Sequence, residues 1–206
     1  LSLIRKTGFI MQQSPFTLCQ PGLVLLIGLA GGLLPGVSQA SSGINANLTA
    51  NIINSTCEIS LQNDGEIYLP TVKRSWFYNS DNSDRLTPTD NEPGTPFSIM
   101  VNSCSENNNS VKQLKFTFTP KSGFSDNQYQ VFKNNATAGA AENVGVVVFS
   151  KDLKTNVLNA DGSSNLLLDA QSTWPGEYSF SARFQNTGVV SAGLVTSQAT
   201  VNVTYE

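Results

Sequence analysis

Short runs of alternating apolar and polar residues dominate the chain from Ser41 to Glu206. The clearest run is Ile44–Ile52, in which every second residue is apolar and the residues between them are Asn or Thr. A period of two places the apolar side chains on one face of a β-strand. Clusters of Asn, Asp, Ser, Gly and Pro separate these runs, as turns between strands would. The pattern therefore predicts an all-β fold.

About ten short strands in one domain are typical of a β-sandwich. A parallel α/β fold would instead need crossover connections of roughly a dozen residues or more, usually helical, between its strands. The expected strands are Ile44–Ile52, Cys57–Leu61, Glu66–Leu69, Phe97–Asn102, Gln113–Thr119, Gln128–Phe132, Gly145–Phe149, Asn165–Leu168, Glu177–Phe184 and Gln198–Tyr205.

A polar stretch, Asn79–Thr95, separates two of these runs and carries four acidic residues and two prolines. Its acids have no regular calcium-ligand spacing, so we expect a solvated surface loop.

The first forty residues have a different composition and are expected to be a secretory signal peptide. Arg5 and Lys6 form a basic start, Gly22–Val37 is apolar, and Ser38-Gln39-Ala40 supplies small residues before a cleavage site. The apolar run is shorter than the roughly 20 residues of a membrane-spanning helix. The first residue is leucine, which indicates a non-standard start codon or a truncation, with Met11 as an alternative start. Cleavage after Ala40 would leave one domain.

Two of the three cysteines, Cys57 and Cys104, lie beyond the predicted leader. An even pair in a secreted chain predicts one disulfide, whereas two free thiols would suit a cytosolic protein better. Beyond the leader, ten Lys and Arg stand against fifteen Asp and Glu, which gives a net charge of −5 without charge blocks. No basic stripe is present, so nucleic acid is not an expected partner.

The sequence contains no histidine, which removes the commonest general base and the commonest metal-binding imidazole. A Ser-His-Asp or Cys-His arrangement is therefore impossible. Gly-rich phosphate loops are also missing. We expect no catalytic, cofactor-binding or metal site, and no enzyme. A carboxylate pair that hydrolyses glycosides is the enzymatic alternative.

Both ends of the segment beyond the leader are amphipathic strands. At the C-terminus, Ala199, Val201, Val203 and Tyr205 share one face. Chain ends usually fray, so a strand that stays amphipathic to its penultimate residue indicates docking, or the ordinary last strand of a sandwich. At the N-terminal end, Ile44–Ile52 suits strand addition, in which main-chain bonds give affinity and alternate side chains give selectivity.

The segment Ser41–Glu206 resembles the chaperone–usher fimbrial subunits, the type 1 pilin-like family. The order and spacing of several segments carry this resemblance. They are Phe97–Cys104, Asn143–Val146, Phe180–Phe184, Thr187-Gly188, Ala192-Gly193 and the terminal Ala199–Glu206.

The resemblance implies an incomplete immunoglobulin-like β-sandwich that is completed by a donor strand from a neighbouring subunit. Residues 41–56 would be a donor-strand extension running into the first strand, and residues 57–206 the pilin domain. The implied donor positions are Ile44, Ala46, Leu48 and Ala50. Where the family has a glycine about seven residues before the first cysteine, this chain has Ala50, which adds one methyl group.

The implied partners are a periplasmic chaperone, an outer-membrane usher and neighbouring pilin subunits, in a surface fimbria that supports cell adhesion. Ala199, Val201, Val203 and Tyr205 would form the chaperone-facing strand, with the Glu206 carboxylate as an anchor. A shaft or adaptor subunit is favoured over a tip adhesin, which carries an additional lectin domain. The alternative from another class is a self-contained carbohydrate-binding sandwich that stacks sugars on Trp76, Phe77, Tyr78 or Trp174.

Overall fold

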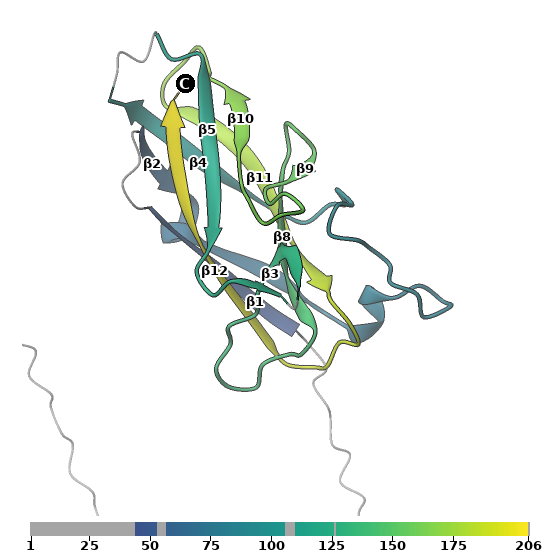
Figure 1. Cartoon of the computed structure of the whole chain (residues 1–206). Helices are drawn as coiled ribbons and strands as arrows, with labels where there is room; N and C mark the ends of the chain where they lie inside the picture. The colour runs from purple at the N-terminus through teal and green to yellow at the C-terminus, as the bar shows by residue number, and fades with distance from the viewer. Residues whose placement is uncertain (1–43, 53–56, 106–109, 126, 206) are drawn as a thin grey trace, which may run out of the picture. The chain divides into compact units, whose positions relative to one another are not determined.

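The computed structural model describes residues 44–52, 57–105, 110–125 and 127–205 (Figure 1). The predicted leader, residues 1–40, lies outside the described residues. Within the described part of the chain, no helix has the length and apolar character needed to cross a lipid bilayer.

Over the described residues, the strands form two sheets. The first sheet has five strands in the order β10 (Leu166–Asp169), β5 (Gln113–Pro120), β12 (Leu194–Tyr205), β1 (Ile44–Ile52) and β3 (Glu66–Val72). The second has the order β2 (Cys57–Leu61), β4 (Thr95–Cys104), β11 (Gly176–Asn186), β8 (Val144–Ser150), β7 (Gln128–Phe132) and β6 (Phe124–Ser125), with β9 (Thr155–Asn156) paired to β8. Two short 3₁₀ turns, η1 (Gln62–Gly65) and η2 (Arg74–Phe77), flank β3.

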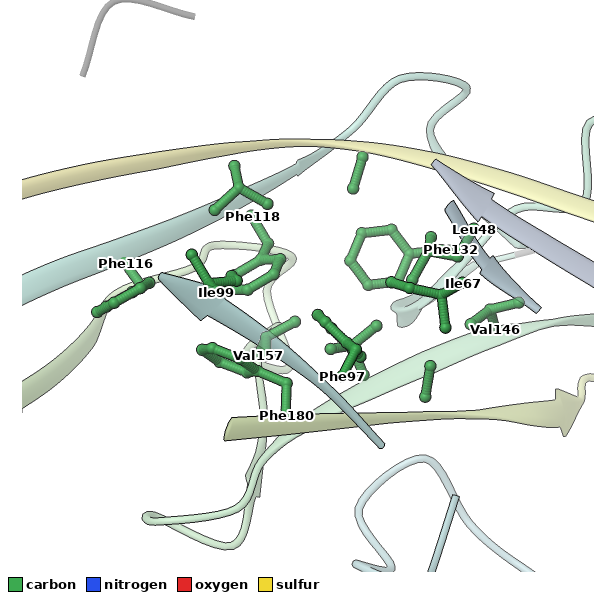
Figure 2. Packing of buried hydrophobic residues seen from close by; sticks show 14 of the residues in the cluster. Leu48, Ile67, Phe97, Ile99, Phe116, Phe118, Phe132, Val146, Val157 and Phe180 are labelled. Carbon is green, nitrogen blue, oxygen red and sulfur yellow. The ribbon is translucent and has the colours of Figure 1, made fainter. Parts of the chain in front are cut away.

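Alternation along the strands places their apolar side chains in one core between the sheets. On β12, the buried positions Val195, Ala199, Val201 and Val203 recur with a period of two. Aromatic rings fill the middle of the core, and the Phe180 ring lies 5.3 Å from that of Phe118 (Figure 2). Aromatic pairs at such distances add stabilisation beyond the area that they bury.

The predicted all-β sandwich is confirmed, and each of the ten expected runs lies in a strand, except that Asn165 precedes β10. The boundaries differ most at the last strand, which begins at Leu194, four residues before the expected Gln198. The short strands β6 and β9 were not expected. Two residues are too few to show a period in the sequence, so only tertiary pairing reveals them.

The polar stretch Asn79–Thr95 is mostly exposed, as expected of a surface loop, but buried side chains of β11 hold it in place. Arg183 is buried, and its Nη2 donates to the carbonyl oxygens of Thr87 and Asp90, at 2.8 Å each. Burial lowers the pKa of Arg183 to about 10, so the guanidinium stays charged at neutral pH. Gln185 Nε2 donates to the carbonyl oxygen of Leu86 at 2.8 Å. The loop is thus anchored over the outer face of the second sheet.

Candidate strand-exchange groove

The strand that lies between β12 and β3 in the first sheet is the N-terminal β1 (Figure 1). It runs parallel to β12, from the pair Asn45–Leu194 to the pair Ile52–Val201. On its other side β1 is antiparallel to β3, where Leu48 is paired with Ile67. The chain therefore closes its own first sheet with the segment that the sequence indicates as a donor strand.

The position of β1 defines a groove with two walls. One wall is β12, whose other neighbour is β5, and the second is β3, whose described pairing is to β1 alone. Without β1, backbone N–H and C=O groups on facing edges of both strands would have no strand partner. Such open edges pair readily with another chain. The groove between β12 and β3 is thus the candidate site at which a strand of another chain could pair.

Leu48 anchors β1 in the core. Its side chain is 3% exposed and belongs to the same buried cluster as Ile67, Phe132 and Val146 (Figure 2). Full burial of a leucine contributes roughly 1.5–3 kcal/mol relative to exposure. On the β12 wall, Leu48 is paired with the buried Ser197, whose Oγ donates to the carbonyl oxygen of Lys133 at 2.8 Å. The buried Ser197 hydroxyl beside Leu48 therefore has a hydrogen-bond partner within the core.

The other three predicted donor positions, Ile44, Ala46 and Ala50, also have backbone partners on the neighbouring strands. The backbone pairs Ala46 with Val195 and Ala50 with Ala199 on β12. Ile44 is paired with Val72 of β3, beyond a register irregularity between Ile44 and Ala46. The structure describes the backbone at these three positions but not their side chains. The role of all four positions in exchange stays a prediction.

The C-terminal strand offers its backbone edge to the groove. Ala199, Val201 and Val203 are buried against the core, and Tyr205 is half-buried at the end of the strand. A strand in the position of β1 would pair with the backbone of β12 from Leu194 to Val201, as β1 does. The role of these side chains in chaperone recognition stays a prediction, and the proposed Glu206 anchor lies outside the described residues.

Sequence reasoning did not single out the β3 wall. Ile67 and Leu69 are buried and face the groove beside Leu48 and Ala46 in the pairing register. The alternation within Glu66–Leu69 indicated a strand, but nothing local in the sequence shows which strand a partner will pair with.

The sequence model of the family described as "Fimbrial protein" matches residues 46–206. The chain belongs to the fimbrial protein family. Over 179 residues it is 33% identical to the uncharacterized fimbrial-like protein YadK of Escherichia coli strain K12, with 81% of this chain and 87% of that protein covered. Among solved structures, the CupB6 tip adhesin of Pseudomonas aeruginosa is similar, with a TM-score of 0.38 and 11% identity. That match covers 54% of this chain, which spans about a third (33%) of the adhesin.

Membership in the fimbrial protein family makes this a structural protein rather than an enzyme. Within the described residues, no group of three or more Cys, Asp or Glu side chains is placed to hold a metal ion.

The predicted disulfide of this fimbrial protein is present. Cys57 at the start of β2 is bonded to Cys104 at the end of β4, and the two residues are direct partners in the strand register. The disulfide ties the first residue after the β1–β2 connection to the second sheet. The disulfide therefore fixes the register of β2 against β4 within the second sheet.

The aromatic residues that a carbohydrate-binding module would use for stacking are largely occupied in this fimbrial protein. Phe77 is buried, and the Trp76 ring packs edge-on against it at 5.1 Å. The Arg85 guanidinium lies over the Trp76 ring, 5.3 Å from the centroid of that ring. Tyr78 Oη accepts a hydrogen bond from the Val190 amide at 2.8 Å. Trp174 packs partly buried against the core.

Proposed function

We propose that this chain is a structural subunit of a surface fimbria that is assembled by donor-strand exchange and supports cell adhesion. The observation that carries the proposal is β1, which lies in the groove between β12 and β3 with Leu48 in the core. A segment that forms a complete strand in one such groove has the length and side-chain pattern to do so in the same groove of a neighbouring copy.

The state with β1 in its own groove is a closed subunit, and the assembled state would have a neighbour's β1 in that position. The two states bury the same kinds of side chains and form similar main-chain bonds. Exchange therefore changes few contacts within the domain, which is the condition under which identical elements swap between copies at low free-energy cost.

A chaperone and an usher fit this account on physical grounds. Before any strand fills the groove, the inward faces of β3 and β12 and two open edges are exposed to solvent, which favours aggregation. A periplasmic chaperone would supply a temporary strand, and an outer-membrane usher would bring the subunits together for exchange. The predicted signal peptide and the disulfide match this route through an oxidising compartment.

A subunit without its own β1 tests the proposal because it can accept a strand but cannot donate one. A tagged variant that lacks Ile44–Ile52 is co-expressed with the wild-type chain and its export system at increasing ratios. Fibre length is measured by electron microscopy, and the tag is located by immunogold labelling.

We expect fibres to shorten as the share of the variant rises, with the tag at fibre ends. Tagged wild-type chain is the matched control and should label fibres along their length. Tagged variant distributed along fibres of unchanged length would contradict donor-strand exchange.

A further inference from the structure

The first part of β12 has β1 on one side and the connection between β7 and β8 on the other. β1 is paired with β12 from Leu194 to Val201. The pairing of β12 with β5 begins only at Ala199. Among the described strands, β1 is therefore the only one that pairs with the segment Leu194–Gln198. This segment loses its strand partner whenever β1 leaves the groove.

The β7–β8 connection binds the backbone edge of this segment that lies opposite β1. The Leu194 amide donates to the Gly139 carbonyl oxygen at 2.7 Å, and the Leu194 carbonyl oxygen accepts from the Ala141 amide at 2.9 Å. The Thr196 carbonyl oxygen accepts from the Asn135 amide at 2.7 Å. These bonds take the place of the ladder that β5 forms with the later part of β12.

The side-chain amide of Asn134 completes this edge as a peptide group of a neighbouring strand would. Its Oδ1 accepts from the Thr196 amide and its Nδ2 donates to the Leu194 carbonyl oxygen, both at 2.9 Å. Within the connection, Oδ1 also accepts from the Ala136 amide at 3.1 Å, and Nδ2 donates to the Ala141 carbonyl oxygen at 2.8 Å. An asparagine amide has two donor hydrogens and an oxygen with two lone pairs, so Asn134 uses its full hydrogen-bonding capacity.

Two further contacts keep the β7–β8 connection against β12. Ser197 Oγ donates to the Lys133 carbonyl oxygen at 2.8 Å from within the core. Immediately before β12, Gly193 has a φ of +156°, and a Cβ atom there would overlap the Ala141 backbone nitrogen. A side chain at position 193 would therefore push the connection away from β12, which only glycine avoids.

Strand exchange passes through a state in which β1 has left the groove and no other strand has entered it. The edge of β12 that faces β3 is then open. If Leu194–Gln198 lost its strand conformation in this state, the next strand would have to order it again, which weakens binding. Asn134 holds the segment from the side that exchange leaves untouched.

We propose, on the basis of the proposed function, that Asn134 is a positioning residue for strand exchange. It keeps Leu194–Gln198 in strand conformation while the groove is empty, so that β1 or a neighbour's strand binds a wall that is already formed. Without the Asn134 amide, this part of the wall opens together with β1.

Amide hydrogen exchange followed by NMR tests the proposal because it reports the opening of individual strands. The oxidised exported chain is compared with Asn134→Ala and with Asn134→Asp, which retains both acceptor sites but loses both donors. Asn156→Ala is the matched control, since Asn156 Nδ2 also donates to two backbone carbonyl oxygens, those of Pro88 and Gln130, but lies on β9 of the second sheet. The informative probe is the Leu194 amide, whose acceptor, the Gly139 carbonyl oxygen, is unchanged in every variant.

In the wild type we expect the amides of β1 to exchange about tenfold or more faster than the Leu194 amide, because β1 leaves while the wall stays formed. In Asn134→Ala the Leu194 amide should exchange as fast as β1, while the amides of β4 and β11 stay within about threefold of their wild-type rates. Asn134→Asp should change the Leu194 rate in the same direction. Asn156→Ala should leave the ratio between the Leu194 and β1 rates as in the wild type.

A Leu194 amide that kept its wild-type rate in both Asn134 variants would overturn the proposal. An increase shared equally by β4 and β11 would also overturn it, because Asn134 would then support the whole fold rather than the wall. A wild-type Leu194 amide that already exchanges with β1 would show that nothing holds the wall. Wild-type β1 amides that exchange no faster than those of β4 and β11 would contradict the proposed function itself, since β1 would leave only on global unfolding.

Discussion

Replacing Leu48 by aspartate is expected to lower the free energy of unfolding by about 4 kcal/mol or more. Truncation of a buried leucine alone costs 2–5 kcal/mol in typical cores. A carboxylate at this position would in addition be buried among Ile67, Phe132 and Val146 without a charged partner. The variant should therefore release β1 and behave like a chain whose groove is open. Denaturant unfolding followed by tryptophan fluorescence measures the change.

Thr49→Asp is the matched control for this prediction. Thr49 follows Leu48 directly on β1 and is only half-buried. Substitutions at such positions usually change stability by less than about 1 kcal/mol. Equal loss in the two variants would show that the effect comes from the β1 backbone rather than from the Leu48 anchor. If both variants kept the wild-type free energy of unfolding, β1 would not occupy the groove in solution.

Removing the disulfide by changing Cys57 and Cys104 to alanine is expected to lower the free energy of unfolding by about 4 kcal/mol. The bond closes a loop with a sequence separation of 47 residues. In the chain-entropy model, a loop of this length is stabilised by roughly that amount because the cross-link restricts the unfolded chain. Thermal unfolding of the double variant beside the oxidised wild type gives the difference.

Reduction of the wild-type protein with a thiol reagent provides an independent check on the same prediction. Reduced wild type and the double variant should unfold at similar temperatures, below that of the oxidised protein. A double variant as stable as the oxidised protein would mean that β2 and β4 are held in register without the bond.

The strands of this fold could be predicted from the sequence because alternation is a local signal. Ile44–Ile52 is an example, since its alternation predicts a strand with Leu48 on the apolar face, and Leu48 is buried in β1. The direction in which that strand enters the sheet could not be predicted. An alternating run has the same apolar face whichever way it points, so a parallel and an antiparallel neighbour are equally compatible with the pattern.

Contacts between distant residues explain what the sequence did not show. The loop Asn79–Thr95 was expected at the surface, yet its anchor, Arg183, lies more than ninety residues further on. Arginine is rarely buried, so its position within a strand carried no signal of this role. The connection between β11 and β12 is similar. Tyr78 accepts a hydrogen bond from the Val190 amide and donates to the Gly188 carbonyl oxygen, and nothing local in the sequence indicates either contact.

The most direct test of strand exchange is the thermal unfolding of the oxidised chain from Cys57 onward, with and without a synthetic peptide of residues 41–54. We predict a peptide-dependent rise in melting temperature of about 10 °C or more, since a strand that binds the folded state alone stabilises it. A chain from Cys57 onward that is already a stable monomer, unfolds cooperatively and does not respond to the peptide would contradict strand exchange.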